Sequence, residues 1–387
     1  MRGERFGAGG GTVNVPAGIT HAVRVLRHRG VDRPAVLAAS PAYANNPYTE
    51  LLLGGCWDVG VAPVAIQHLK DVHHLSIAQA LGADVLLNVH WTNQLQATDR
   101  DETIAAHARF RDTVERLDLP VTWTLHNRLP HECAHPDLEI ELRRWLADRA
   151  KVVHVMGEQT ADAVADLYPL DPARTVVVPH PSYQGVYPDT VHRDQARWEL
   201  GLHPDEGVLL LFGGIRPYKN VPFALDALDE LLARGRRVRV VVAGMLVGHW
   251  EGRSDLQQTL MTHPAVNAHL GRVTEQDVQR YFRAADAVLL PYTSIVNSGV
   301  LLLGSTWGVP AVATGQGEVG ALVDQTGIGV TYDPDGGPDA LADAVEQTLD
   351  GDRDAMRGAA LGLSEELRPD VIAEQYARKV VLPALGR

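Results

Sequence analysis

The sequence predicts an α/β protein built from two doubly wound domains in series. Short apolar runs with the length of buried strands alternate with segments of helical spacing, first over residues 34–157 and again over residues 207–314. Buried strands that alternate with amphipathic helices are typical of a parallel sheet covered on both faces. The stretch VVVPHPSYQGVYPDT separates the two halves, and its proline, tyrosine and glycine content is typical of an inter-domain linker.

The first half is predicted to contain five strands. Each is an apolar run of strand length, and together they cover 34–40, 61–66, 83–90, 121–127 and 151–157. Helical spacing of apolar residues lies between them, at 48–60, 76–81, 104–117 and 137–150. This order indicates parallel strands joined by helical crossovers.

The alternation restarts at residue 207. Strands are predicted at 207–214, 237–244, 286–292 and 310–314, and helices at 221–235, at 274–285 with Thr274 as N-cap, and in the apolar run 301–308. Two doubly wound domains in series form a cleft between the carboxyl ends of their strands, where a ligand is expected. We therefore expect an N-terminal domain at 1–187 and a C-terminal domain at 188–367. A terminal helix in 368–387 is expected to pack back on the N-terminal domain.

Composition excludes several classes of protein. The formal net charge of the 387 residues is -13, whereas a nucleic-acid binder needs an excess of Lys and Arg. Two cysteines, Cys56 and Cys133, are too few for a disulfide framework. No apolar run reaches the roughly 18 residues of a membrane span, and the N-terminus lacks the apolar core of a signal peptide. We expect a cytoplasmic protein with no nucleic-acid partner and no stable membrane insertion.

One segment concentrates positive charge. HAVRVLRHRGVDR carries four arginines, Arg24, Arg27, Arg29 and Arg33. We interpret it as a solvated basic helix, and the alternative is a surface that meets acidic lipid or substrate.

The segment LFGGIRPYKNV is the first candidate for chemistry. A predicted strand opens into Gly213 and Gly214, and Arg216 and Lys219 follow before a helix begins. Glycines let a ligand approach the backbone, and two cations three positions apart can both reach one diphosphate. A glycine turn with two solvated cations is the alternative interpretation.

The second candidate is the polar break Asn297-Ser298-Gly299 within LLPYTSIVNSGVLLLGSTWGVPAV. A core helix would not need this interruption, whereas an anion site at a helix N-terminus would, because free N–H groups point at the ligand there. An ordinary serine N-cap is the alternative. Both candidates follow strands of one domain, which favours a single nucleoside-diphosphate site over two unrelated turns.

Four segments together carry a family resemblance. FGGIRPYKNV, GRVTEQDVQRYFRAADAVLLPY, NSGVLLLGSTWGVPAVAT and VTWTLHNRLPHE resemble retaining glycosyltransferases of the GT-B type, which have two Rossmann-like domains facing across a cleft. More narrowly, they resemble the bacterial branch of the large mannosyl- and glucosyl-transferring family, of the group 1 or family 4 type, with the motifs IRPYKG, LPY…SG and HN…PHE. The resemblance extends over nearly all of the chain from about Pro34 and is strongest over 207–314.

The resemblance implies a donor site in the C-terminal domain and acceptor binding in the N-terminal one. The donor is a nucleoside-diphosphate sugar, most often linked to GDP or UDP, with no separate cofactor and no metal. The implied catalytic residues are His126, which would touch the transferred sugar, and Arg216 and Lys219, which would hold the diphosphate. The segment Gly271-Arg272-Val273 would lie beside the base of the donor. The implied donor contacts are Gly213, Gly214, Arg216, Lys219, Gly244, Arg272, Val273, Asn297, Ser298, Gly299 and Val300.

The chain departs from the family at three places. Most members carry two glutamates around the phosphate helix, and the corresponding positions here lie near Ile295 and Leu303. The side chains of Ile295 and Leu303 are apolar and cannot form a hydrogen bond with a ribose hydroxyl. The usual arginine five residues before the lysine is Gly214, with Arg216 as its substitute. A glutamate usually found near Ala321 is absent, with Glu318 nearby.

Several other motifs are interpreted as structural. Gly7, Gly9 and Gly10 resemble a dinucleotide fingerprint, but no strand precedes them. Two groups of possible zinc ligands, His131/Cys133/His135 and His68/His73/His74, lack a complete set of four ligands. Two acidic pairs, Asp99/Asp101 and Asp333/Asp335, lie in polar loops. His180 and Tyr183 lie in the predicted hinge and receive no catalytic role.

We therefore expect a metal-independent enzyme that moves a sugar from a nucleoside-diphosphate sugar to an acceptor hydroxyl or other nucleophile, with retention of configuration. The acceptor class is open among a small natural product, a glycolipid and a polysaccharide precursor. Two alternatives are kept, namely a nucleotide-sugar epimerase of the same fold and a non-catalytic nucleotide-sugar-binding partner. No pair of carboxylates supports a glycosidase mechanism.

Overall fold

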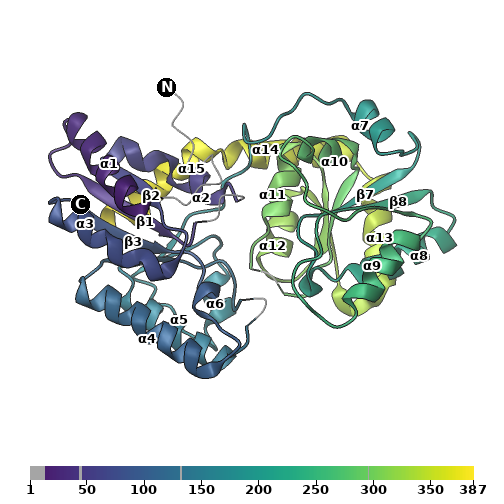
Figure 1. Cartoon of the computed structure of the whole chain (residues 1–387). Helices are drawn as coiled ribbons and strands as arrows, with labels where there is room; N and C mark the ends of the chain where they lie inside the picture. Colours follow the sequence, from purple (N-terminus) through teal and green to yellow (C-terminus); the bar gives the residue numbers. More distant parts are fainter. Residues whose placement is uncertain (1–13, 43–45, 131–132, 295) are drawn as a thin grey trace. The chain divides into compact units, whose positions relative to one another are not determined.

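The computed structural model describes residues 14–42, 46–130, 133–294 and 296–387. These residues form two compact units, one within Met1–Pro181 together with Pro369–Arg387, and the other Ser182–Arg368 (Figure 1). The predicted boundaries were 187/188 and 367/368. Residues 182–183 lie in the second unit because the Ser182 N–H donates to Leu367 O at 2.7 Å and the Tyr183 N–H donates to Thr306 Oγ1 at 3.2 Å.

The first unit is a six-stranded parallel sheet with helices between the strands. Its strands are β1 Ala35–Ser40, β2 Val61–Ala65, β3 Asp84–Val89, β4 Val121–Thr124, β5 Val152–Val155 and β6 Thr175–Val177. Its helices are α1 Val15–His28, α2 Tyr48–Leu53, α3 Leu75–Ala80, α4 Arg100–Arg116, α5 Pro136–Arg149, α6 Thr160–Val164, α15 Pro369–Tyr376 and α16 Leu382–Ala384. Short helical turns are η1 Gly54–Val59, η2 Leu69–His74, η3 Asn93–Leu95 and the π-turn η6 Ala377–Val381. The spatial strand order is β2-β1-β3-β4-β5-β6.

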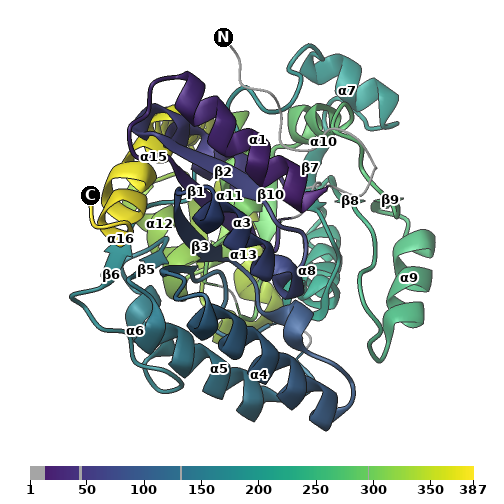
Figure 2. The ribbon, with the colours of Figure 1, turned by 60° about the vertical axis from the view of Figure 1, so that its left-hand side comes forward.

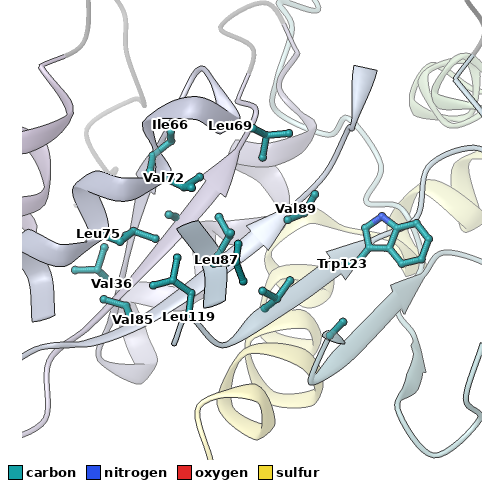
Figure 3. Close-up of a cluster of buried hydrophobic side chains, with 14 of the residues drawn as sticks. Val36, Ile66, Leu69, Val72, Leu75, Val85, Leu87, Val89, Leu119 and Trp123 are labelled. Atoms are coloured by element: carbon teal, nitrogen blue, oxygen red, sulfur yellow. The ribbon is translucent and has the colours of Figure 1, made fainter. Parts of the chain in front are cut away.

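Alternation along the strands assigns one face of this sheet to an apolar core. Every second residue, such as Val36, Leu87 and Trp123, joins a buried cluster with side chains of the helices that cover this face (Figure 3). Figure 2 shows α1 and α3 against the sheet, and both helices contribute to the cluster.

The opposite face of the same sheet carries a buried polar cluster that contacts the C-terminal segment. Asn88 Nδ2 donates to Thr124 Oγ1 at 3.1 Å, and Tyr376 Oη of α15 donates to Asn88 Oδ1 at 3.1 Å. These side chains are buried, so their polar atoms need partners inside the protein. A hydrogen-bond network therefore joins residues 369–387 to the first unit.

The second unit repeats this architecture. Its strands are β7 Gly207–Phe212, β8 Val238–Ala243, β9 Val266–His269, β10 Ala287–Leu290, β11 Ala311–Thr314 and β12 Gly329–Tyr332, all parallel, in the order β12-β11-β10-β7-β8-β9. Its helices are α7 Arg193–Glu199, α8 Val221–Ala233, α9 Arg253–Thr262, α10 Val278–Ala284, α11 Gly299–Thr306, α12 Gly317–Thr326, α13 Gly337–Asp350 and α14 Arg353–Glu366, with the turns η4 Pro217–Lys219 and η5 Pro334–Gly336. Helices α8 and α13 pack together and contribute to the apolar core of this unit, and α11 packs with α14 (Figure 1).

The predicted fold class, two doubly wound α/β domains, is confirmed, and several elements differ from the prediction. Strands β6, β9 and β12 were not predicted; they are three- and four-residue edge strands with mostly half-buried residues. The helix expected at 274–285 begins at Val278, and Thr274 is not its N-cap. The Thr274 hydroxyl instead donates to Asp277 Oδ2 at 2.6 Å, while residues 275–277 form a turn.

Candidate functional site

The topology of the second unit identifies one place for a ligand. The chain runs from β7 outward to β8 and β9 in one direction, and it places β10, β11 and β12 on the other side of β7. Strands β7 and β10 are therefore the neighbours at which the winding direction changes. Ligands of doubly wound sheets bind at the carboxyl ends of the strands at such a switch point.

Glycines at the carboxyl ends of β7 and β8 allow two backbone segments to approach closely. The Gly213 N–H donates to Ala243 O at 2.8 Å, and Gly213 has a φ of 84°. A Cβ atom on Gly244 would lie 2.0 Å from Gly213 O, so only glycine fits there. These glycines, both predicted as donor contacts, are required by the fold of the edge itself.

Lys219 is buried at this edge and does not project into solvent. Its side chain, in a residue that is 5% exposed, donates from Nζ to Phe212 O, and Nζ lies 5.9 Å from the centroid of the Tyr292 ring. Burial, followed by the positive charge of Arg216, lowers the pKa of Lys219 to about 7. Arg216 is partly buried, in the extended residue that precedes η4. The interpretation of both cations as solvated surface residues is therefore wrong for Lys219.

The two sequence motifs lie side by side in the structure. The Thr293 N–H, just beyond β10, donates to Tyr218 O at 2.9 Å, and the Tyr218 and Tyr292 ring centroids are 5.4 Å apart. Tyr292 also forms a side-chain hydrogen bond with Ser298. This contact joins the end of β10 to the start of α11, so the Gly213–Lys219 loop and the Asn297–Gly299 break border one site.

Ser298 caps α11 and defines which N–H groups are available at its start. Ser298 Oγ accepts the Leu301 N–H at 3.3 Å, and Ser298 is in an extended conformation. By helix geometry the N–H groups of Gly299 and Val300 have no acceptor within α11, and both residues are partly buried. Positive helix-dipole charge and donors therefore gather at the switch point.

The remaining predicted donor contacts occupy the same edge of the sheet. Arg272 and Val273 follow β9, and Arg272 is exposed. Asn297 is partly buried directly before Ser298. Glu318 lies in the first turn of α12, which follows β11, while Leu303 is buried within α11. Ile295 lies outside the described residues.

In the first unit, His126 belongs to a cluster of aromatic side chains at the carboxyl ends of β3 and β4. His90 Nδ1 lies 3.1 Å from His126 Nε2, and the Trp91 ring stacks on His126 with centroids 4.3 Å apart. Tyr48 contacts His126 edge-on at 5.1 Å. Burial lowers the pKa of His126 well below its usual value, and the nearby histidines and Arg143 add to this effect. His126 is thus a neutral imidazole at neutral pH.

The loop that follows His126 is held by a buried ion pair. Arg143 Nη1 donates to Asn127 O at 2.5 Å and to Arg128 O at 3.0 Å, and Arg143 Nε donates to Glu139 Oε1 at 2.7 Å. Glu139 is fully buried one helical turn earlier on α5. This pair fixes the backbone on the carboxyl side of His126.

Sequence reasoning missed His90 and the Glu139–Arg143 pair. The signal for His90 was present, because ADVLLNVH ends in histidine just as VTWTLHN carries histidine after its strand. The i,i+4 spacing of Glu139 and Arg143 was visible, but such a pair is usually solvated.

Other candidate residues have structural partners or lie outside the site. His180 Nδ1 is 2.7 Å from Pro181 O, and burial lowers the pKa of His180 to about 4. Tyr183 is buried in the other unit, which raises its pKa. Gly7, Gly9, Gly10 and His131 are not among the described residues. Over the described ranges, no group of three or more His, Cys, Asp and Glu side chains is placed to hold a metal ion.

A cavity of about 310 Å³ lies at the opposite edge of the second sheet, where β7 and β8 begin. Asp286 dominates it, and its carboxylate accepts from Arg193 Nη2 at 2.5 Å, Arg197 Nη2 at 2.6 Å, Arg353 and the Val208 N–H at 2.8 Å. This network joins α7, β7, β10 and α14. It lies away from the switch point and is a structural ion cluster.

The second unit is similar to a known family of proteins. Residues 206–351 match the family model "Glycosyl transferases group 1", and the match contains both loops of the switch point. A GDP-mannose:glycolipid 4-beta-D-mannosyltransferase of Xanthomonas campestris pv. campestris is 28% identical over 306 residues, which is 78% of this chain and 80% of that protein. A D-inositol 3-phosphate glycosyltransferase of Kineococcus radiotolerans is 28% identical over 65% of this chain and 62% of its own length.

The chain is a glycosyltransferase. Two solved structures share its GT-B fold, both with low sequence identity. Sucrose-phosphate synthase of Thermosynechococcus elongatus has a TM-score of 0.68 and 14% identity, covering 92% of this chain and all of that chain (100%). Anabaena HepE in complex with UDP-glucose has a TM-score of 0.66 and 16% identity, covering 90% of this chain and 99% of that chain. The glycosyltransferase has no helix, among its described residues, that is long and apolar enough to cross a membrane.

Proposed function

We propose that this glycosyltransferase moves a hexosyl group from a nucleoside-diphosphate sugar to an acceptor hydroxyl, with retention of configuration and without a metal ion. The observation that carries the proposal is the switch point of the second unit. There Arg216, Lys219 and the start of α11 border one site between neighbouring strands. Cations and helix N–H groups at one sheet edge are suited to a diphosphate.

Departure of the diphosphate is the step that this site would assist. Negative charge develops on the leaving phosphate as the glycosidic bond breaks, and fixed donors stabilise it without reorganisation. Arg216 offers a guanidinium, and the N–H groups of Gly299 and Val300 offer the dipole of α11. The Lys219 ammonium now donates to Phe212 O, and we expect it to exchange this carbonyl for a phosphate oxygen.

His126 of the first unit is proposed to hold the transferred sugar. The imidazole is neutral and is fixed by His90 and Trp91, so it offers a hydrogen bond in a set orientation. Such positioning lowers the barrier most when the contact strengthens in the transition state. Gly213, Gly214 and Gly244 would allow close approach of the donor, and Arg272 and Val273 would lie beside its base. Glu318 lies near Ala321, at which the family usually carries a glutamate.

The proposed donor is linked to GDP or UDP. The Xanthomonas relative uses GDP-mannose, and the HepE structure contains UDP-glucose. The acceptor is proposed to be a glycolipid, a polysaccharide precursor or a small natural product, and the mannosyltransferase relative acts on a glycolipid.

The test is a panel of UDP-, GDP- and dTDP-sugars offered to the purified protein, read by thermal shift and by sugar transfer in excess EDTA. A bound donor raises the melting temperature by mass action. Transfer to an added acceptor is expected to survive EDTA. Conversion of one sugar into another without acceptor would make the protein an epimerase, and binding without any reaction would make it a binding partner. Loss of transfer in EDTA with recovery on Mg²⁺ or Mn²⁺ would contradict the metal-free mechanism.

Retention is tested separately by the one-bond C–H coupling at the new anomeric centre. An α-linked donor is expected to give an α-linked product. The Xanthomonas relative is a 4-beta-D-mannosyltransferase, so the product configuration is a decisive measurement. A β-linked product from an α-linked donor would replace retention by inversion and would leave the donor site in place.

A further inference from the structure

The pair formed by His90 and His126 determines which nitrogen of His126 carries the proton. His90 directly follows β3 and is 2% exposed, and its Nδ1 lies 3.1 Å from His126 Nε2. His90 Nε2 is buried and has no hydrogen-bond partner among the described residues. One nitrogen of each ring therefore faces the other ring, and the second nitrogen of His90 faces the protein interior.

Both rings are neutral near pH 7. Burial, with a smaller effect of His154, lowers the pKa of His90 to about 3, and burial lowers that of His126 well below its usual value. A neutral imidazole has one N–H donor and one acceptor nitrogen. In the bond between these two rings, one ring must donate and the other must accept.

The environment of His90 Nε2 selects the donor. If His90 accepted at Nδ1, its only proton would sit on the buried Nε2, where no acceptor lies among the described residues. Buried N–H groups without an acceptor are rarer than buried acceptors without a donor. His90 therefore donates from Nδ1, and His126 accepts at Nε2 and carries its own proton on Nδ1.

We propose that His90 is a positioning residue that fixes His126 as the Nδ1–H tautomer and sets the orientation of its ring. This inference rests on the proposed role of His126 in holding the sugar. The 3.1 Å contact from His90 acts together with Trp91, whose ring stacks on His126 at an interplanar angle of 20°. The two contacts restrict rotation of the His126 imidazole.

The tautomer has a chemical consequence for the reaction. Nε2 of His126 is occupied by the His90 N–H, and Nδ1 carries the proton, so neither nitrogen has a free lone pair. His126 can then donate a hydrogen bond to a sugar oxygen but cannot take a proton from the acceptor hydroxyl. This suits a retaining transfer, and it excludes His126 as the general base that an inverting transfer needs.

Nuclear magnetic resonance tests the tautomer directly, without any substrate. Long-range ¹H–¹⁵N correlation spectra of histidine-labelled protein at pH 7.5 distinguish Nδ1–H, Nε2–H and cationic rings, and the His126→Asn variant assigns the His126 signals. We expect His126 as the neutral Nδ1–H form. An Nε2–H or cationic His126 would overturn the proposal, whatever the enzyme transfers.

Two substitutions of His90 test its effect on catalysis. Leucine has similar bulk and no donor, whereas the asparagine amide can donate from near the position of Nδ1. His90→Leu is expected to lower kcat by about tenfold or more, with a change of less than about threefold in the donor KM, and to give mixed His126 tautomers. His90→Asn is expected to restore most of kcat. His21→Asn, at an exposed histidine of α1, is the matched control and should leave kcat unchanged.

The outcomes separate this inference from the proposed function. A wild-type kcat in folded His90→Leu would overturn the inference and leave the glycosyltransferase assignment intact. If the spectrum shows His126 as the Nδ1–H form but the protein transfers no sugar, the proposed function is wrong and the inference about the tautomer still holds. If His90→Leu does not fold, the His126 tautomer in the wild-type spectrum and the kcat of His90→Asn still test the inference.

Discussion

Lys219 illustrates how burial changes the chemistry of one residue. The sequence predicts a solvated, phosphate-binding lysine after the glycine loop. In the structure Lys219 is 5% exposed and its ammonium donates a hydrogen bond to Phe212 O. Its pKa is lowered to about 7, first by burial and then by Arg216. Two phenol groups border the same site, those of Tyr218 and Tyr292, and burial raises the pKa of both, so they are neutral there.

Nucleotide binding is therefore expected to take up a proton at Lys219. The ammonium is lost as pH rises through about 7 in the free protein, and a bound diphosphate favours the charged form and raises its pKa. The affinity for a nucleoside diphosphate should fall between pH 7 and 9 by up to about tenfold per pH unit. The phosphate itself ionises at about pH 6, so in this range the change comes from Lys219. Calorimetry in buffers of different ionisation enthalpy measures the uptake. Equal affinity at pH 7 and 9 would contradict the prediction, and Lys219→Arg should remove the dependence.

His126 is the residue of the first unit whose removal should affect catalysis most. His126→Ala is expected to lower kcat by about 100-fold, with little loss of nucleotide affinity, because the proposed contact is to the sugar and strengthens in the transition state. Steady-state kinetics and nucleotide titration measure the two effects. Loss of nucleotide binding with an unchanged kcat would make His126 structural.

At the scale of elements, the interruption before α11 now has a physical explanation. Strand β10 ends at Leu290, and the Tyr292 side chain is buried. Ser298 Oγ then accepts the Leu301 N–H, so the apolar helix α11 begins with two N–H groups that have no acceptor within the helix. A serine N-cap and an anion site are therefore compatible at one helix start. The cap satisfies one donor and leaves Gly299 and Val300 for a ligand.

Substitution of Gly299 tests whether a ligand approaches that helix start. Gly299→Val is expected to crowd the diphosphate and weaken nucleoside-diphosphate binding by about tenfold, with an intrinsic helix cost below about 1 kcal/mol. The matched control is Gly362→Val in α14, where an added Cβ meets open space, and it should leave affinity unchanged. Affinity by titration and melting temperature are the two readouts. A bound nucleotide more than about 6 Å from the Gly299 N–H would refute the site.

At the scale of the whole molecule, each unit has its own sheet and core, and the two edges of the second sheet serve different purposes. The carboxyl edge carries the proposed donor site, whereas the amino edge carries the Asp286 cluster. Asp286 is shared by three arginines, and Arg197 among them is 3% exposed. Stability and binding are thus assigned to opposite ends of the same strands.

Removal of the Asp286 carboxylate is expected to destabilise the protein and to spare binding. Asp286→Ala leaves the Arg197 guanidinium buried without its carboxylate and should cost about 3–5 kcal/mol of unfolding free energy. Nucleotide affinity of the folded variant should change by less than about twofold, because the cluster lies at the far edge. Asp229→Ala, which removes an exposed partner of His263, is the control and should unfold like the wild type. An unchanged denaturation midpoint for Asp286→Ala would contradict this account.

The sequence by itself determined the two-domain α/β fold, and its resemblance to GT-B glycosyltransferases predicted the enzyme class. Long apolar runs at β1, β3, β7 and β8 predict buried parallel strands, and the glycine, arginine and lysine spacing in LFGGIRPYKNV predicts a phosphate loop. These signals are local, because a buried strand needs consecutive apolar residues and a phosphate loop needs glycine next to cations. The edge strands β9 and β12 were missed because their half-buried residues carry no apolar run, whereas the valines of β6 were assigned to the linker.

Only the tertiary structure decided which distant residues share an environment. It buried Lys219 beside Tyr292 and thereby lowered its pKa, and it placed His90 against His126, although each pair is far apart in sequence. It also showed that Gly244 is glycine because Gly213 O would lie 2.0 Å from a Cβ atom there. Proton affinity, tautomer and close packing depend on the neighbours that the folded chain brings together, and one-dimensional spacing does not specify those neighbours.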